Sequence, residues 1–138
     1  MTSREERTEK LATNLEIFVC EAHIFTSDAI LLADFAKPRH KDKCCDLGTG
    51  NGIIPLLWLR DFKPKEIFGV ELSESAVELL KKTLKHNNIE DKVNLYHIDL
   101  KRYMLMNINR NDLERKSPFS FFPQKRETEK ARKYCHNV

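Results

Sequence analysis

A seven-residue loop constrains the fold of this chain more than any other segment. It reads Asp46-Leu47-Gly48-Thr49-Gly50-Asn51-Gly52, follows a short apolar run from Lys43, and precedes another that starts at Ile53. Its glycines let the backbone turn sharply and come close to a ligand, because no side chain intervenes. A helix that starts at Ile53 would add free N–H groups and the positive end of its dipole. The loop therefore predicts a strand–turn–helix unit whose turn binds a ligand.

The same rhythm of strand and helix continues along the chain. Strands are expected at 43–47, 66–71 and 93–99, and helices at 27–36, at 53–61 and from the Ser73 cap to the Asn87-Asn88 stop. Such alternation predicts a parallel, doubly wound sheet with right-handed crossovers. The expected fold class is therefore α/β, an incomplete Rossmann-like doubly wound parallel sheet.

The helix at 27–36 is expected to be largely buried. Apolar residues at 29, 32, 33 and 36 follow the spacing of one helix face, and those at 30, 31 and 35 widen it. Thr26 or Ser27 would cap its first N–H groups.

Acidic side chains stand at the ends of all three expected strands. Asp46 ends the first, Glu71 the second and Asp99 the third. Ligands of parallel sheets bind beyond these ends. Glu71 lies nineteen residues beyond Gly52, where a carboxylate can accept hydrogen bonds from both hydroxyls of a ribose, and Asp99 could accept one from an adenine amino group. The sequence therefore predicts a pocket for an adenosine group.

Two phosphate-binding motifs are incomplete in this loop. A dinucleotide fingerprint requires G-x-G-x-x-G, whereas the third glycine here comes one residue early and Ile53 holds the expected place. A P-loop requires Lys and Ser/Thr after its last glycine, and neither follows Gly52. No pyrophosphate site is predicted.

The loop spacing resembles the first motif of class I S-adenosylmethionine-dependent methyltransferases. In that family the loop packs against the methionine portion of the cofactor, and the acid after the second strand holds its ribose. The segment 25–36, followed by the loop, resembles the opening of the bacterial tRNA(Val) adenine N6-methyltransferase family, which belongs to the small-domain methyltransferases. The resemblance extends from Leu15 to Leu100.

This resemblance implies S-adenosylmethionine as cofactor and methyl transfer to the exocyclic nitrogen of a tRNA adenine beside the anticodon. The implied cofactor-binding residues are Asp46, Gly48, Thr49, Gly50, Asn51, Gly52, Glu71, Leu72 and Asp99. Thr26 and Asp28 would lie near the methionine end, and helix capping is an equally good explanation of these two.

The chain departs from the family pattern where the catalytic residues are expected. Family members place an Asn-Pro-Pro-Tyr/Phe motif at the end of the fourth strand. Its asparagine accepts a hydrogen bond from the target amine and its aromatic ring stacks on the flipped base. No Asn-Pro-Pro occurs in this sequence; the nearest string, 116–123, has prolines and aromatic residues without an asparagine. No catalytic residue is assigned, and this chain alone is expected to be inactive.

The sequence divides into two parts. Residues 1–100 are the expected cofactor-binding half of a methyltransferase domain, the N-terminal half of the class I fold. Residues 101–138 are a basic tail with net charge +6, against −3 for the rest. Within the tail, 119–122 is the one candidate strand, so the strand at 43–47 would keep an open edge. Because each unpaired buried backbone group costs about 1–3 kcal/mol, we expect a truncated or frame-disrupted chain. The tail is interpreted either as an RNA contact or as a solvated charged segment.

Composition sets the remaining expectations. The chain has 138 residues, which suit one domain with a single core. No apolar run approaches the length of a membrane span and no secretory signal is evident, so we expect a cytoplasmic protein without membrane contact. The four cysteines and five histidines lack metal-ligand spacing, and no metal is expected. Cys44 and Cys45 are interpreted as core residues.

The leading hypothesis is an S-adenosylmethionine-dependent methyltransferase acting on tRNA adenine N6. Methylation of rRNA or of a protein glutamine is an alternative, because the enzymes that catalyse these reactions share the Asn-Pro-Pro-Tyr motif. A function of another class is a non-catalytic fragment that binds adenosine cofactors, or a partner subunit completed by another chain. The sequence leaves these alternatives open.

Overall fold

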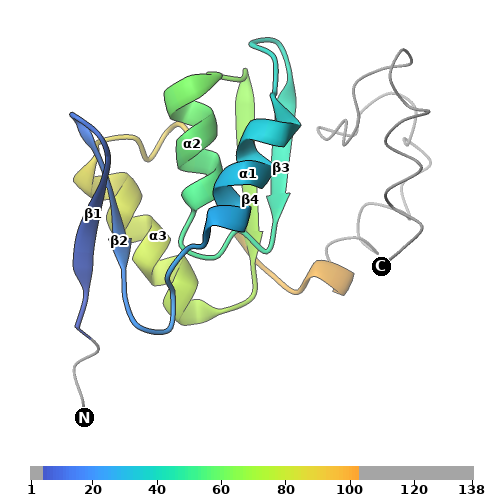
Figure 1. Ribbon diagram of the computed structural model, residues 1–138. Coiled ribbons are helices and arrows are strands. Elements are labelled where there is room, and N and C mark those ends of the chain that lie inside the picture. Colours follow the sequence, from blue (N-terminus) through green and yellow to red (C-terminus); the bar gives the residue numbers. More distant parts are fainter. Residues whose placement is uncertain (1–4, 103–138) are drawn as a thin grey trace.

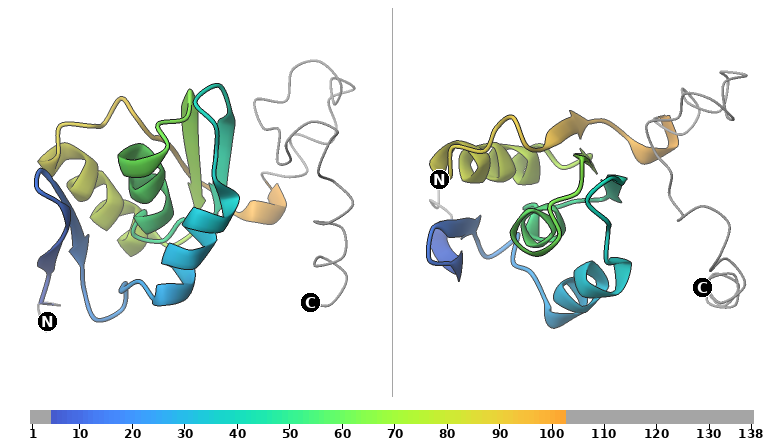
Figure 2. Two further views of the ribbon diagram at one scale, coloured as in Figure 1. Left: turned by 45° about the horizontal axis from the view of Figure 1, so that its top comes forward. Right: turned by 90° about the horizontal axis from the view of Figure 1, so that it is seen from above.

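The computed structural model describes residues 5–102 (Figure 1). An antiparallel hairpin of β1 (Arg7–Ala12) and β2 (Leu15–Val19) comes first. It is followed by α1 (Ser27–Ala36), β3 (Lys43–Leu47), α2 (Ile53–Asp61), β4 (Glu66–Glu71), α3 (Glu74–His86) and β5 (Asn94–His97). The last three strands form a parallel sheet in the order β3-β4-β5, and the three helices lie on one side of it (Figure 2).

The parallel sheet confirms the predicted α/β class. Asp46 on β3 lies beside Gly69 on β4, and Glu71 on β4 lies beside His97 on β5. The three strands therefore end at one edge of the sheet, the lower edge in Figure 1. The bounds of β3, β4, α1 and α2 agree with the prediction, whereas β5 is shorter than the expected 93–99.

Helices α2 and α3 supply most of the core. Residues 53–58 of α2 are buried in succession, and Pro55 lies in the first turn, where no helical hydrogen bond is lost. As predicted, α3 turns Ala76, Val77, Leu80 and Leu84 inward and its lysines outward. The Ser73 hydroxyl accepts from Ala76 N at 3.4 Å, and Asn87 caps the other end of the helix.

The prediction that α1 is largely buried is wrong for the part of the chain that the structure describes. Ala33 is its one buried residue, while Leu31 is 67% and Phe35 78% exposed. The inner side packs on α2, where Trp58 Nε1 donates to Ala33 O at 3.2 Å. Apolar spacing shows which residues could be buried but not whether a neighbour covers them. The predicted side-chain cap is also absent. Thr26 is the N-cap residue, but its side chain accepts no capping hydrogen bond from α1.

β3 is an edge strand of the sheet that the structure describes. All five of its residues are partly buried, and its pairing partner within 5–102 is β4. The open edge expected from the sequence is therefore present in this part of the chain.

No periodicity in the sequence predicts the hairpin of β1 and β2. The side chains of Ile17 and Val19 are fully buried, and β2 is held against α3 by polar side chains. Thr83 Oγ1 accepts from Phe18 N at 3.1 Å, and the Asn87 amide accepts from Glu16 N at 3.0 Å and donates to Glu16 O at 2.7 Å. These bonds join residues far apart in sequence, which is why local patterns do not reveal them.

Several predicted features lie outside the described residues. They are the string at 116–123, the candidate strand at 119–122, Cys135 and nearly all of the basic tail. Between residues 5 and 102, no helix has the length and apolar character that crossing a bilayer requires.

Candidate functional site

The glycine loop is fastened to β4 by its backbone. Gly48 N and Thr49 N both donate to Val70 O, at 2.8 and 3.0 Å, and Gly52 N donates to Thr49 O at 2.9 Å. Gly50 adopts φ +58, in the left-handed region that glycine tolerates best. A side-chain carbon at Gly48 or Gly50 would meet nothing within 4 Å, so the loop leaves open space beside these two glycines.

Gly52 is required for another reason. It is the N-cap residue of α2 with φ +87, and a side-chain carbon there would collide with Leu80 of α3. The third glycine of the motif therefore allows α3 to pack closely against the start of α2.

Glu71 joins the end of β4 to the loop after β3. Its Oε2 accepts from Gly50 N at 2.8 Å, and its Oε1 accepts from Leu72 N at 2.9 Å and from Ser73 N at 2.8 Å. One carboxylate thus binds the glycine loop, the end of its own strand and the segment that leads into α3.

Asp46 lies at the end of β3, mostly buried. Burial raises the pKa of its carboxyl from 3.8 to about 6; the nearby Thr49 hydroxyl lowers this pKa in part, and the negative charge of Glu71 raises it. The edge of the sheet therefore holds two carboxyl groups whose negative charges repel each other.

Thr49 and Asn51 are the buried polar residues of the loop. Thr49 fills the space beside Gly69, and its buried hydroxyl lies near the Asp46 carboxyl, whose pKa it lowers in part. Asn51 Nδ2 donates to His23 O at 3.3 Å. The Asn51 side chain therefore ties the loop to the turn before α1.

Leu72 and Asp99 follow β4 and β5 at the same edge. Leu72 is exposed, and its carbonyl accepts from His97 Nε2 at 3.0 Å. Asp99 is also exposed, and its Oδ1 accepts from Lys101 N at 2.7 Å. Both residues lie on the side of the site nearest β5.

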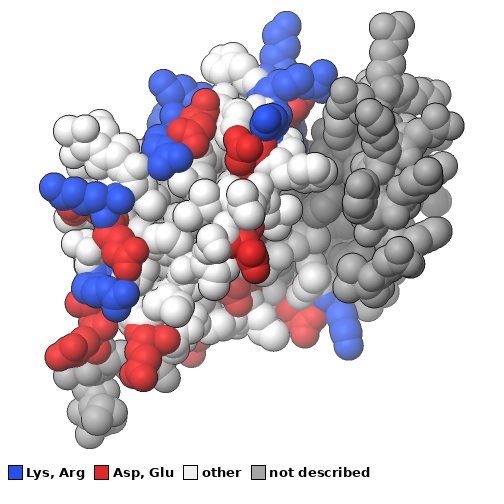
Figure 3. All heavy atoms as spheres, in the orientation of Figure 1, with Lys and Arg blue, Asp and Glu red and all other residues white. Residues whose placement is uncertain are grey.

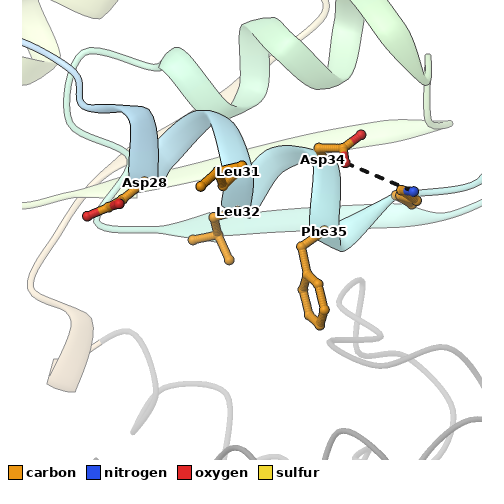
Figure 4. A pocket seen from close by; sticks show the side chains of 6 residues that line it. Asp28, Leu31, Leu32, Asp34 and Phe35 are labelled. Carbon is orange, nitrogen blue, oxygen red and sulfur yellow. Dashed lines mark ion pairs between the residues drawn. The ribbon is translucent and has the colours of Figure 1, made fainter.

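Thr26 and Asp28 are exposed at the start of α1. Asp28 lines an open hollow along this helix together with Leu31, Leu32, Asp34, Phe35 and Lys37, and Asp34 pairs with Lys37 at 4.0 Å (Figure 4). In residues 5–102, neither Thr26 nor Asp28 forms a hydrogen bond with the glycine loop. Their predicted place in the cofactor site stays a prediction.

Two residues near the site, His23 and Ser75, carry no motif that would reveal them. His23 Nε2 lies 2.8 Å from Ser75 Oγ, which in turn lies 3.1 Å from the Ser73 hydroxyl. The backbone of His23 also binds Asn51. These contacts hold the turn before α1, the glycine loop and the start of α3 together, and they depend on side chains that are distant in sequence.

The arrangement suits a nucleoside with a ribose diol. Glu71 offers a carboxylate at the loop, and the positions beside Gly48 and Gly50 leave room for close approach. Among the described residues, no three His, Cys, Asp or Glu side chains gather in a way that could hold a metal ion.

Comparisons with known proteins show which family the sequence matches. A sequence model of the family described as "Methyltransferase small domain" matches residues 10–109. A tRNA1(Val) (adenine(37)-N6)-methyltransferase of Pasteurella multocida is 31% identical over 99 residues, which are 71% of this chain and 41% of the relative. The protein of the same name from Proteus mirabilis is 30% identical over 118 residues, 82% of this chain and 46% of the relative. The chain thus spans less than half the length of these relatives.

Solved structures share the fold. A SAM-dependent methyltransferase of Agrobacterium tumefaciens superposes with a TM-score of 0.59 at 14% identity, covering 78% of this chain and 36% of that one. An RNA methyltransferase of Salinibacter ruber, solved with S-adenosyl-L-homocysteine, gives a TM-score of 0.50 at 23% identity, covering 56% of this chain and 50% of that one. At these identities the likeness concerns the fold alone.

Substitution of two loop glycines should have unequal effects on stability. Both Gly48 and Gly52 have positive φ, where alanine is strained by about 1–2 kcal/mol. Gly52→Ala also collides with Leu80, which adds about 1–3 kcal/mol of overpacking, whereas Gly48→Ala meets open space. Urea unfolding of the two variants measures the difference, and equal losses would contradict the close packing of α3 on Gly52.

The raised pKa of Asp46 should make part of the stability depend on pH. Its folded-state pKa of about 6 exceeds 3.8, so between these values the folded protein binds more protons than the unfolded one. The contribution of Asp46 is therefore most favourable below about pH 4 and is lost as the pH rises through about 6, a change of about 3 kcal/mol. Urea unfolding from pH 3.5 to 7.5 should show wild type losing stability relative to Asp46→Asn. A difference that stays constant across this range would contradict the prediction.

Proposed function

Because this chain belongs to the methyltransferase small-domain family, we propose that it binds S-adenosylmethionine at the glycine loop and serves methyl transfer to a tRNA adenine. The family and the Rossmann-like fold expected from the sequence are confirmed. The cofactor site and the methylated substrate of this chain are the proposal.

One contact carries the cofactor proposal. Glu71 Oε2 lies 2.8 Å from Gly50 N, so the acid at the end of β4 lies at the loop after β3. Ligands of parallel sheets bind at this edge, and an acid in this place can accept hydrogen bonds from ribose hydroxyls. The contact therefore brings the glycine loop together with the acid that lies nineteen residues beyond Gly52 in the sequence.

The proposed roles follow from where each residue lies. Glu71 holds the ribose, the backbone at Gly48 and Gly50 approaches the methionine portion, and Leu72 and Asp99 border the adenine. Asn51 contributes by its backbone, since its amide group is bound to His23 O. Bound S-adenosylmethionine supplies a methyl group on a positively charged sulfur, already activated for displacement. The residues of this chain supply position and orientation.

The tRNA substrate is supported by the names of the relatives from Pasteurella multocida and Proteus mirabilis. The basic residues that could bind RNA lie mostly beyond residue 102. In Figure 3 the surface over α1, in the middle of the view, is largely uncharged, with acidic side chains standing out from it. The division at residue 100, the cytoplasmic location and an RNA contact of the tail stay predictions.

The family match and the names of the relatives support methyl transfer and do not favour the alternative of a non-catalytic cofactor-binding fragment or of a partner subunit completed by another chain.

Removal of the Glu71 carboxylate should weaken binding of S-adenosylhomocysteine. A hydrogen bond to a charged group contributes about 1.5–3 kcal/mol, so Glu71→Ala should bind at least about tenfold more weakly in titration calorimetry. Glu74→Ala is the matched control, because Glu74 is exposed in the first turn of α3. Circular dichroism checks that both variants are folded. Equal affinities of wild type and Glu71→Ala would exclude Glu71 from the ribose site.

A methyl-transfer assay tests whether the residues of this chain alone can orient the target amine. With radiolabelled S-adenosylmethionine and unmodified tRNA, this chain alone should transfer little or no methyl group, because no asparagine of an Asn-Pro-Pro motif orients the amine. The full-length Pasteurella multocida relative serves as the positive control. Transfer at a comparable rate would show that another residue of this chain orients the amine.

A further inference from the structure

The hydrogen bonds of Glu71 use most of what its carboxylate can accept. A carboxylate has two oxygens with about four lone-pair sites. Oε1 accepts from both Leu72 N and Ser73 N, and Oε2 accepts from Gly50 N. One site on Oε2 therefore remains, whereas a ribose offers two hydroxyl donors. Full recognition of the diol by Glu71 requires the carboxylate to give up one backbone N–H.

The bond to Gly50 is the one that the structure allows to break. Leu72 and Ser73 directly follow Glu71, and Ser73 is fixed as the cap of α3 through Ala76 N and through Val77 N, which donates to Ser73 O at 3.0 Å. The N–H groups of Leu72 and Ser73 therefore stay beside the Glu71 carboxylate, and their hydrogen bonds to it are kept. Gly50 belongs to another segment, and the space beside its Cα is open.

The anchors of the loop support a local change at Gly50. On its two sides, Gly48 N and Thr49 N are bound to Val70 O, and Gly52 N to Thr49 O. The buried Asn51 side chain holds the loop to His23 O. A reorientation of the Gly50 N–H thus leaves the rest of the loop attached to β4.

We infer that Glu71 exchanges the Gly50 N–H for a ribose hydroxyl when a nucleoside with a vicinal diol binds. Glu71 is then both the ribose acceptor and a positioning residue that holds the loop before binding. The inference rests on the proposed function, because it takes the ligand to be an adenosine cofactor. It assigns to the site a preference for ribose over dideoxyribose, and it couples ribose binding to release of the Gly50 N–H from Glu71.

The test observes the hydrogen bond itself. In the full chain labelled with 15N and 13C, through-hydrogen-bond coupling between Gly50 N and Glu71 Cδ reports the contact. The coupling should be present in the free protein, lost with saturating adenosine or S-adenosylhomocysteine, and retained with saturating 2′,3′-dideoxyadenosine. Couplings from Leu72 N and Ser73 N to the same carbon are internal controls and should persist throughout.

Each outcome separates the inference from the proposed function. Binding of adenosine with the Gly50 coupling intact would overturn the exchange and leave the cofactor site standing. Loss of the coupling with dideoxyadenosine as well would overturn the role of the diol. Failure of every nucleoside to bind would overturn the proposed function and the inference with it. Amide hydrogen exchange gives a second readout, since Gly50 should exchange at least about threefold faster with adenosine than with the dideoxy analogue.

Discussion

The arrangement of the site depends on the three backbone hydrogen bonds that Glu71 accepts. They connect the loop after β3, the end of β4 and the start of α3 at one point on the sheet edge. A charged acceptor gives stronger hydrogen bonds than a neutral one, and three donors on one carboxylate restrict its rotation. The loop therefore has a defined shape, held by the carboxylate that we propose as the ribose acceptor.

Packing beneath the loop limits the same shape. Gly52 allows Leu80 to approach the start of α2, and Gly69 leaves the space that Thr49 fills. Asp46 is enclosed at the end of β3, where burial and the charge of Glu71 keep the pKa of its carboxyl high. Because close packing admits few alternatives, the loop is determined by residues of α3 and β4 as much as by its own glycines.

The sequence predicts the parts of this structure that depend on local order along the chain. The alternation of strand and helix, the bounds of β3, β4, α1 and α2, and the Ser73 cap follow from spacing and capping chemistry. The exposure of α1 does not, because burial depends on a neighbour that spacing cannot identify. The hairpin and the link from His23 to Asn51 and Ser75 also could not be predicted, since they rest on bonds between distant residues. The position of Glu71 at the end of its strand is predictable from the sequence. The three backbone N–H groups that its carboxylate binds are seen only in the structure.

The attachment of β2 to α3 has a consequence for the order of folding. An isolated two-stranded hairpin is marginally stable in water, and β2 binds Thr83 and Asn87, more than sixty residues later in the chain. During synthesis the hairpin is thus made before the helix that holds it. Docking of β2 can occur only after α3 has been made and its last turns have formed.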